Sequence, residues 1–221
     1  MTADNPYFKT DSLIGSSNTT FSLNLEYTPE YYYFIRNNQK IMHESKYPTF
    51  CIGFKQAISG RSSAFSLAEF GIKQIIDIGN WSMFRYSISM GSFLNTSARA
   101  FPDYHHLNSQ PQAVMIGTYF DSFQLLDYYK YSCTGNFIEI QTQYRSQLLL
   151  LKRLPIISDR IWSENIFLRY ANNNQLHNFI EAGYSMGNIL GLANVGIFVA
   201  YENFRYRSTG IKLCLGIDRT R

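Results

Sequence analysis

The chain has 221 residues, of which 16% are charged and 16% are aromatic, and its formal net charge is +4. Ordinary soluble domains carry about 25% charged residues, so the surface of this protein must be short of charge. Lys and Arg are scattered singly along the sequence, whereas a phosphate backbone requires a dense basic stripe. We therefore expect no nucleic-acid partner.

The spacing of the cysteines and the length of the apolar runs exclude further classes of protein. Cys51, Cys133 and Cys214 are far apart and lack metal-ligand spacing. A disulfide between two of them is not readable from the sequence, and buried free thiols are the simpler interpretation. No apolar run reaches the roughly 18 residues of a transmembrane helix. The opening MTADNPYFKTDS lacks the features of a signal peptide, so we expect the sequence to be the C-terminal part of a longer protein.

A two-residue period, which is the mark of a β-strand, recurs along the chain. In the first run, small and polar residues alternate with Phe21, Leu23, Leu25 and Tyr27. The same alternation recurs at 49–55, 64–77, 84–91, 138–145, 165–170, 177–186, 195–202 and 211–217.

The length of these runs favours strands that cross a membrane, because tilted strands spanning hydrocarbon need about 9–11 residues, whereas soluble strands average five or six. We predict an all-β fold, an antiparallel meander of about nine or ten strands that forms the C-terminal part of a transmembrane β-barrel. The barrel segment covers 20–217. Residues 1–19 are either an N-terminal tail or the remnant of an upstream strand, and 218–221 are a C-terminal tail.

Loop lengths predict the orientation, because bacterial barrels have short periplasmic turns and longer external loops. Segments 151–159 and 188–194 become periplasmic turns, and 95–133 becomes one long external loop. Within that loop, Phe123, Leu126 and Tyr129 have the spacing of a short helix. Segment 28–47 is either one long hairpin with its turn at RNNQ or an extension of two strands beyond the membrane.

Three phrases of the sequence, YTPEYYYFIRNNQKIMHESKYPTFCIGFKQAI, LLLLKRLPIISDRIWSEN and FRYRSTGIKLCLGI, resemble the C-terminal barrel region of a Bacteroidetes-type outer-membrane family of unknown function. Members of that family carry an N-terminal carboxypeptidase-regulatory-like domain, and their barrel looks like the BamA-like surface-antigen barrel. The resemblance implies a bacterial outer-membrane location. It also implies three partners, namely membrane lipid, the barrel assembly machinery, and the N-terminal strands and periplasmic domain of a longer protein.

The resemblance also assigns two groups of residues. The superfamily has a lumen-inserted loop with an Arg-Gly-aromatic signature, and the nearest match is Arg99 and Phe101, with alanine in place of the glycine. A solvated loop arginine is the alternative. The C-terminal signal by which barrels are recognised for assembly is similar to the spacing of Ser208, Gly210, Leu213 and Leu215, although these residues also suit a plain amphipathic strand.

The charged residues of the alternating runs fall mostly on the polar face. We predict a lumen-facing position for them, where they either pair across strands or line a water-filled path. They are Arg85, Glu139, Arg145, Arg169, Glu181, Glu202 and Lys212.

Catalytic and metal chemistry is weakly indicated. A zinc site would need ligands of the kind found at Asp103, His105 and His106, but no further His or Cys lies near them in the sequence. His177 and Ser185 share a strand face with Glu181, but residues four apart on a strand are ~13 Å apart, too far for a hydrogen-bonded relay. We predict no catalytic residue, cofactor or metal.

The resulting functional hypothesis is a non-enzymatic outer-membrane barrel, related to assembly, translocation or transport by superfamily analogy. A soluble antiparallel barrel or sandwich that binds a small apolar ligand is the alternative. That alternative requires polar outward faces and strands of about six residues.

Overall fold

The structure is a computed structural model that describes residues 18–30, 33–42, 45–60, 64–79, 81–95, 101–147, 149, 162–189 and 193–216. Nine long strands of 10–14 residues dominate the described part of the chain. They are β1 (Asn18–Tyr27), β4 (Thr49–Gly60), β5 (Ser66–Ile78), β6 (Ser82–Asn95), β8 (Phe137–Ser146), β9 (Ser163–Asn173), β10 (Phe179–Ile189), β11 (Ala193–Glu202) and β12 (Arg205–Leu215). The predicted all-β class and strand number are confirmed.

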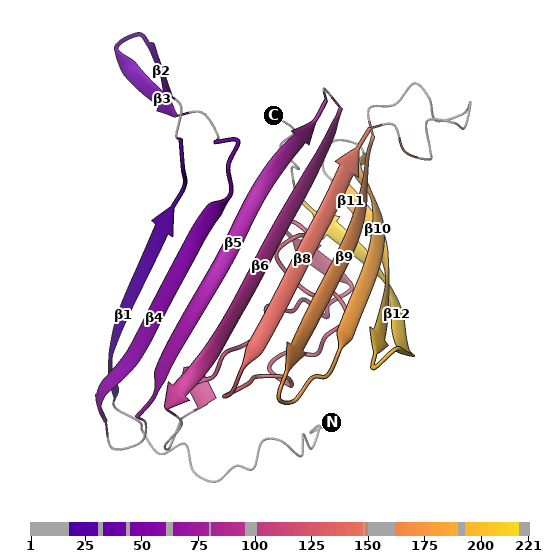
Figure 1. Ribbon diagram of the computed structural model, residues 1–221. Helices are drawn as coiled ribbons and strands as arrows, with labels where there is room; N and C mark the ends of the chain where they lie inside the picture. The colour runs from indigo at the N-terminus through magenta and orange to yellow at the C-terminus, as the bar shows by residue number, and fades with distance from the viewer. Residues whose placement is uncertain are drawn as a thin grey trace.

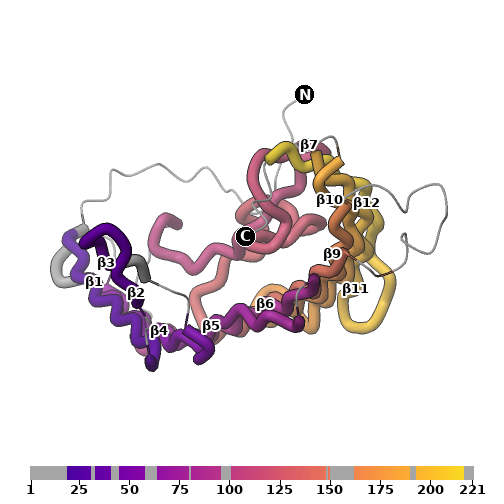
Figure 2. Tube along the Cα trace, turned by 90° about the horizontal axis from the view of Figure 1, so that it is seen from above, coloured from indigo at the N-terminus to yellow at the C-terminus, as the bar shows by residue number. Residues whose placement is uncertain are grey.

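The long strands form one sheet in which each pairs antiparallel with the next, in the order β1-β4-β5-β6-β8-β9-β10-β11-β12. A short strand, β7 (Val114–Ile116), adds to β12 in parallel and completes the ten-stranded sheet. The sheet curves into an open arc with β1 and β12 at opposite sides (Figure 1; Figure 2). Figure 1 views its convex face. The barrel is not closed.

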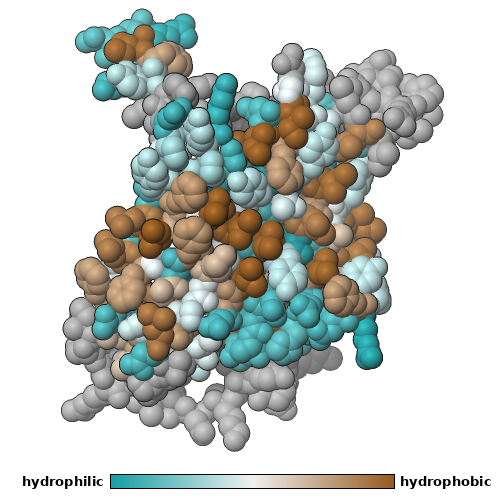
Figure 3. All heavy atoms as spheres, in the orientation of Figure 1, coloured by the Kyte–Doolittle hydropathy of each residue, from teal (hydrophilic) through white to brown (hydrophobic). Residues whose placement is uncertain are grey.

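The two faces of the sheet have opposite polarity to those of a soluble protein. On β9, the convex Leu168 is 53% exposed, whereas the concave Arg169 is 1% exposed. The same alternation leaves large apolar side chains exposed along the sheet, among them Phe21, Leu23, Leu25, Ile52, Phe70, Ile166, Val195, Ile197 and Ile211. Figure 3 shows the apolar side chains as a broad band across the middle of the strands, with hydrophilic side chains along its lower edge. The apolar side chains of the strands therefore point outward, on the convex face of the sheet.

Residues 101–136, which we call the inserted loop, connect β6 to β8 and lie on the concave side of the arc (Figure 2). The loop contains a 3₁₀ turn at Phe101–Asp103 and β7, but no helix forms over residues 120–131. The helix prediction was therefore wrong. Phe123 and Leu126 are both 0% exposed because they pack with Leu176 and Phe179 in one apolar cluster. Their spacing fits the concave wall and not a helical face.

The segment between β1 and β4 forms a separate two-stranded hairpin of β2 (Tyr33–Arg36) and β3 (Gln39–Met42). Asn37 and Asn38 connect the two strands with φ of 50° and 61°, the left-handed values of a two-residue hairpin turn, which Asn tolerates well. The predicted turn at RNNQ is confirmed, and Figure 1 shows the hairpin beyond the ends of β1 and β4.

Two sequence predictions lie mainly or wholly outside the described residues. These are the tails at 1–19 and 218–221, of which only Asn18 and Thr19 are described, and the turn at 151–159. Over the part of the chain that is described, we find no helix with the length and apolar character needed to cross a bilayer.

Candidate functional site

The inserted loop and the wall beneath it form the candidate site, because here the concave face buries polar and charged groups. Two of the apolar clusters seat the middle of the loop. One places Phe123 and Leu126 against Phe179, and the other places Met115 and Tyr119 against Phe167, Phe198 and Cys214. Charged and polar contacts then fix the position of the loop between these clusters.

The central contact is a buried ion pair between neighbouring strands. Arg169 on β9 and Glu181 on β10 are register partners, and both side chains are 0% exposed. Glu181 also accepts hydrogen bonds from the backbone N–H groups of Gln124 at 2.9 Å and Leu125 at 2.9 Å, while Arg169 donates to the carbonyl of Tyr119. Burial of two charges is costly unless further hydrogen bonds compensate it. Here the loop backbone supplies such bonds to both side chains, although the buried Arg169 Nε has no hydrogen-bond partner among the described residues.

Aromatic rings fill the space beside this ion pair. The Arg169 guanidinium lies 4.9 Å and 5.3 Å from the ring centroids of Phe167 and Phe198, in cation–π geometry. The ring of Phe198 lies over Gly183 on the adjacent strand, where a Cβ atom would approach it to 2.2 Å. The Tyr119 ring packs on Phe198 at 5.2 Å. The glycine therefore makes room for the aromatic seat of the loop.

The loop is also tied to the last two strands. The Tyr119 hydroxyl lies 2.8 Å from the carbonyls of Asn194 on β11 and Lys212 on β12. The Lys212 ammonium donates to the carbonyls of Pro111 at 2.6 Å and Gln112 at 3.1 Å. Together with the β7–β12 pairing, these contacts cover the free edge of β12 over residues 213–215.

A histidine fixes the start of the loop. His105 Nε2 lies 2.6 Å from Glu139 on β8, and its Nδ1 lies 3.4 Å from Glu69 on β5. The imidazole stacks on Phe137 at 3.5 Å. Burial alone would lower the pKa of His105, but the hydrogen bonds and charges of the two carboxylates outweigh it and raise the pKa to about 9. The histidine is therefore a cation between two acids at neutral pH.

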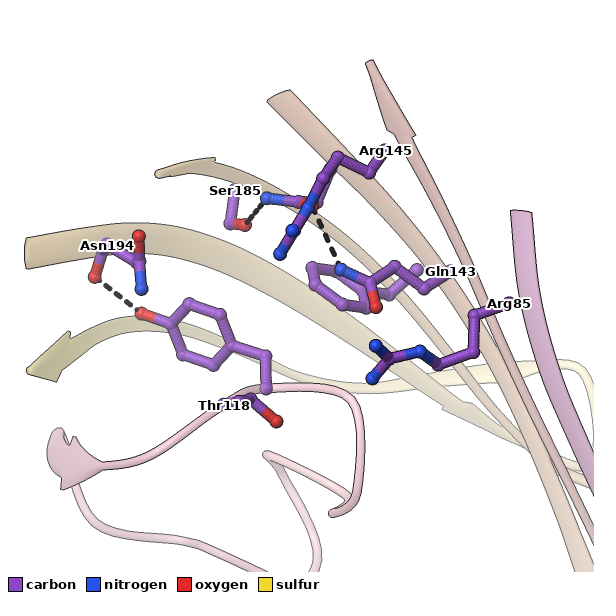
Figure 4. A pocket seen from close by; sticks show the side chains of 9 residues that line it. Arg85, Thr118, Gln143, Arg145, Ser185 and Asn194 are labelled. Carbon is purple, nitrogen blue, oxygen red and sulfur yellow. Dashed lines mark hydrogen bonds between the residues drawn. The ribbon is translucent and has the colours of Figure 1, made fainter. Parts of the chain in front are cut away.

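A small polar cavity of about 50 Å³ lies between the loop and the wall. Its described lining includes two arginines, Arg85 and Arg145, and no acidic residue. Figure 4 shows both guanidinium groups extending from their strands toward the same space, with the Gln143 amide between them. The rest of the lining comprises Thr118, Tyr119, Asn165, Phe167, Ser185 and Asn194.

The structure places the predicted lumen-facing residues on the concave side, although whether that side is a lumen stays a prediction. Arg169 and Glu181 pair across strands, as one of the two hypotheses held. Arg85 and Arg145 line the cavity, while Lys212 and Glu139 contact the inserted loop. Glu202 lies at a strand end, where Arg207 donates to it at 3.1 Å.

Other predicted site residues are distributed along the loop and the last strand. Arg99 lies outside the described residues, whereas Phe101 packs against Tyr104, His106 and Tyr129. The four predicted assembly-signal positions all lie on β12, opposite Ala200, Phe198, Val195 and Ala193 of β11; they are Ser208, Gly210, Leu213 and Leu215.

The structure does not bring together the residues of the metal site and the catalytic site that were considered from the sequence. His105 is paired with glutamates, and His106 Nδ1 lies 2.7 Å from Ser132. Glu181 holds the loop, and Ser185 accepts from Asn165. Among the described residues, we find no cluster of three or more His, Cys, Asp or Glu side chains placed to hold a metal ion. All three cysteines are free thiols.

Sequence reasoning missed the loop side of the site. Tyr119 and the backbone N–H groups of Gln124 and Leu125 carry most of the contacts with Arg169 and Glu181. A backbone donor has no signature in the sequence. The usable signal is the pair itself, because an arginine and a glutamate on polar faces of adjacent strands both need partners when they are buried.

Comparison with known proteins identifies the family of this chain. No curated protein and no solved structure matches it significantly. A model of the C-terminal domain of a family of unknown function, DUF5686, matches residues 1–186, from before β1 into β10. The match covers well over half of the sequence, and the chain therefore belongs to the DUF5686 family of unknown function.

Proposed function

We propose that the chain is the C-terminal part of a β-barrel in the bacterial outer membrane and that it acts without catalysis. The observation that carries the proposal is the inverted polarity of the sheet. Leu168 and Ile197 are about half exposed on the convex face, while Glu181 and Arg169 are buried on the concave face. Lipid would cover the apolar band, and strands of 10–14 residues are long enough to cross hydrocarbon.

The alternative of a soluble barrel or sandwich with an apolar ligand has less support. Such a module would need an apolar cavity for its ligand, but the apolar clusters of this concave face are filled by the inserted loop and are separated by buried charged and amide side chains. It would also leave the exposed aliphatic side chains of β9, β11 and β12 in water, at a cost of about 25 cal/mol per Å² of apolar surface.

Spin labels would test the membrane proposal. The chain is refolded into lipid vesicles, and its heat-modifiable gel mobility reports folding. Labels at Ile166, Leu168 and Ile197 are expected to be accessible to oxygen and protected from a water-soluble relaxation agent. Ser87 and Gln141, which are paired concave positions on β6 and β8, serve as matched controls and should show the reverse. A chain that stays monomeric in detergent-free buffer, with all five sites shielded from both agents, would overturn the proposal.

Within the membrane we propose a role in assembly or translocation of other proteins. The family resemblance suggests it, and the inserted loop supports it because a pinned loop occupies part of the concave space that free solute passage would use. Replacing Glu181 with Gln in the native cell should release the loop. An assembly role predicts a broad loss of other barrel proteins from the outer-membrane fraction, measured by quantitative mass spectrometry. An unchanged barrel proteome with altered uptake of a solute would favour transport.

A further inference from the structure

The short strand β7 occupies one end of a longer strand edge, where it lies beside β12 at the end of the arc (Figure 2). The backbone N–H of Leu213 on β12 donates to the Ala113 carbonyl at 2.8 Å, and the Leu215 carbonyl accepts from the N–H of Gly117 at 3.1 Å. These bonds lie on the edge of β12 opposite to β11. One edge pairs with one strand at a time, so β7 excludes any other strand from this end of β12.

The rest of that edge is available to a strand. Backbone groups of alternate residues point to the same edge, so Ile211 and Thr209 continue the set formed by Leu213 and Leu215. Within the part of the chain that the structure describes, no strand pairs with this edge over 205–212. The N–H and C=O groups of such an edge are a template for a further strand.

We propose that β7 blocks a docking site for an antiparallel β-strand on this edge of β12 and is displaced when that strand binds. The inference rests on the proposed barrel, because its wall closes only when a strand pairs with β12. Ile211 and Leu215 are 70% and 43% exposed on the convex face. The partner that fits is therefore an extended strand with apolar side chains at alternate positions.

β7 itself has the polarity of a wall strand. Met115 is buried with Cys214 in one apolar cluster of the concave face. Val114 and Ile116 are 53% and 85% exposed on the opposite side, where the register places them beside Leu213 and Leu215. Until the partner arrives, β7 thus continues the apolar convex face of the sheet past β12.

The attachment of β7 is short but closely fitted. Only three residues pair, and they pair in parallel, which is slightly less stable per residue than antiparallel pairing. Lys212 opposes displacement, because its Nζ donates to the Pro111 carbonyl at 2.6 Å and its carbonyl lies 2.8 Å from the Tyr119 hydroxyl. The exit from β7 leaves no spare room, since a Cβ atom on Gly216 would lie 2.7 Å from the Gly117 carbonyl oxygen.

The first test compares one protein in two redox states. Met115→Cys in a Cys51→Ala background places a thiol in register with Cys214. Neighbouring strands are about 4.8 Å apart, a spacing that a disulfide can bridge. Oxidation of the full chain in detergent micelles, checked by mass spectrometry, should therefore fix β7 on β12, and reduction should free it again.

The strand probe is a fluorescent peptide with the sequence of residues 205–216 carrying Cys214→Ser, because a copy of β12 can pair antiparallel with β12 across a twofold axis. By fluorescence anisotropy, the oxidised Met115→Cys chain should bind the peptide at least about tenfold more weakly than the reduced chain. The control Val114→Cys places its thiol on the opposite face from Cys214 and should show no redox effect.

A second variant frees β7 without altering the docking edge, and it keeps the test valid if the cysteine variant fails to fold. Gly216→Ala pushes against the Gly117 carbonyl and should tighten peptide binding at least about fivefold. Gly135→Ala is the matched control in the inserted loop, because its added Cβ would meet its nearest neighbour at 3.6 Å. Its affinity for the peptide should equal that of the unmodified chain.

Two results would overturn the inference. Equal peptide affinity in the oxidised and reduced Met115→Cys chains would show that β7 does not compete with the peptide. Absence of binding to Gly216→Ala would show that this edge of β12 takes no strand. Neither result touches the barrel proposal, which is tested by spin labels in lipid vesicles. A chain that fails the spin-label test but exchanges β7 for the peptide would keep the docking edge and lose the membrane.

Discussion

At the scale of single residues, Glu181 connects the inserted loop to two strands of the wall. Its negative charge is shared between one guanidinium and two peptide N–H groups of the inserted loop. The pair therefore joins three segments, namely β9, β10 and the loop. An ordinary buried ion pair joins two side chains and is often replaceable by apolar residues.

Glu181→Gln should detach the middle of the loop. The amide keeps the shape of the side chain but leaves Arg169 as a buried charge without its counterion, at a cost of about 3–5 kcal/mol. Hydrogen exchange followed by mass spectrometry should show faster exchange over residues 119–126. Glu202→Gln, which removes a partly exposed carboxylate, is the control and should leave this exchange rate unchanged. Equal exchange in both variants would contradict the anchoring role.

Removing both charges of the ion pair should not restore the attachment of the loop to the wall. In many proteins a double apolar replacement of a buried pair is neutral or stabilising. Here Arg169→Met combined with Glu181→Leu leaves the N–H groups of Gln124 and Leu125 without their acceptor, which costs about 1–3 kcal/mol for each buried group. The loop of the double variant should exchange as fast as that of Glu181→Gln. Protection at the level of the unmodified chain would show that the side chains matter only to each other.

His105 makes the loop sensitive to alkaline pH. Its pKa is raised from the ordinary value of 6.5 to about 9. Its contribution to the stability of the attached loop is therefore complete below pH 6.5 and is lost as the pH rises through about 9. Exchange protection of residues 101–108, corrected for intrinsic rates, should fall between these values. His105→Gln should be less protected at pH 6 and lack this dependence. A pH profile identical to that of the unmodified chain would refute the assignment.

At the scale of elements, small residues on the concave face determine where the loop can lie. Gly183 leaves space for the ring of Phe198, which supports Tyr119. Gly91 does the same for Phe137, on which His105 stacks, because a Cβ atom there would lie 2.4 Å from that ring. The glycines of the sheet thus determine where the aromatic rings that support the loop can lie.

Gly183→Ala should displace Phe198 and loosen the loop, because overpacking of this kind costs about 1–3 kcal/mol. The thermal midpoint of heat modification should fall, and exchange around Tyr119 should rise. Gly71→Ala is the matched control on β5, since its added Cβ would meet its nearest neighbours at 3.5 Å, an ordinary contact. If the two variants have the same thermal midpoint, the glycine has no role in seating the loop.

The sequence predicted the strands better than the loop, for a physical reason. Alternation records which face each side chain occupies, so the runs containing Ile166 and Ile197 could be read directly. Phe123 and Leu126 are buried by the wall in the absence of any helix, and their spacing gave a helix that does not form. The convergence of Arg85 and Arg145 depends on the register of β6 and β8, which local periodicity does not specify.

At the scale of the whole molecule, the direction of the strands limits how the arc can close. Nine long strands joined by eight antiparallel pairings place β1 and β12 in the same direction. Direct pairing of these two edges would be parallel. An all-antiparallel closure needs an odd number of further strands, or a second copy related by a twofold axis that pairs like edges.

The chain alone should therefore associate through β1 with β1 of a second copy, because β7 already covers part of β12. Leu23→Cys in a Cys51→Ala background, treated with a short thiol crosslinker in detergent, should give homodimers. Cys133 and Cys214 are 0% exposed and should not react. Mixed with an Ile211→Cys chain of different length, it should give few heterodimers. Predominant heterodimers would indicate parallel pairing of β1 with β12.

The inserted loop also has a mechanical consequence. Its hydrogen bonds and ion pairs reach β5, β8, β9, β10, β11 and β12, through residues that include His105, Tyr119 and Gln124. A segment attached at so many points acts as a brace across the arc and fixes its radius of curvature there. β1 is held in the sheet by β4, at the opposite side. The wall is thus stiff toward β12 and compliant toward β1, so a force that widens the arc will bend it at the β1 side first.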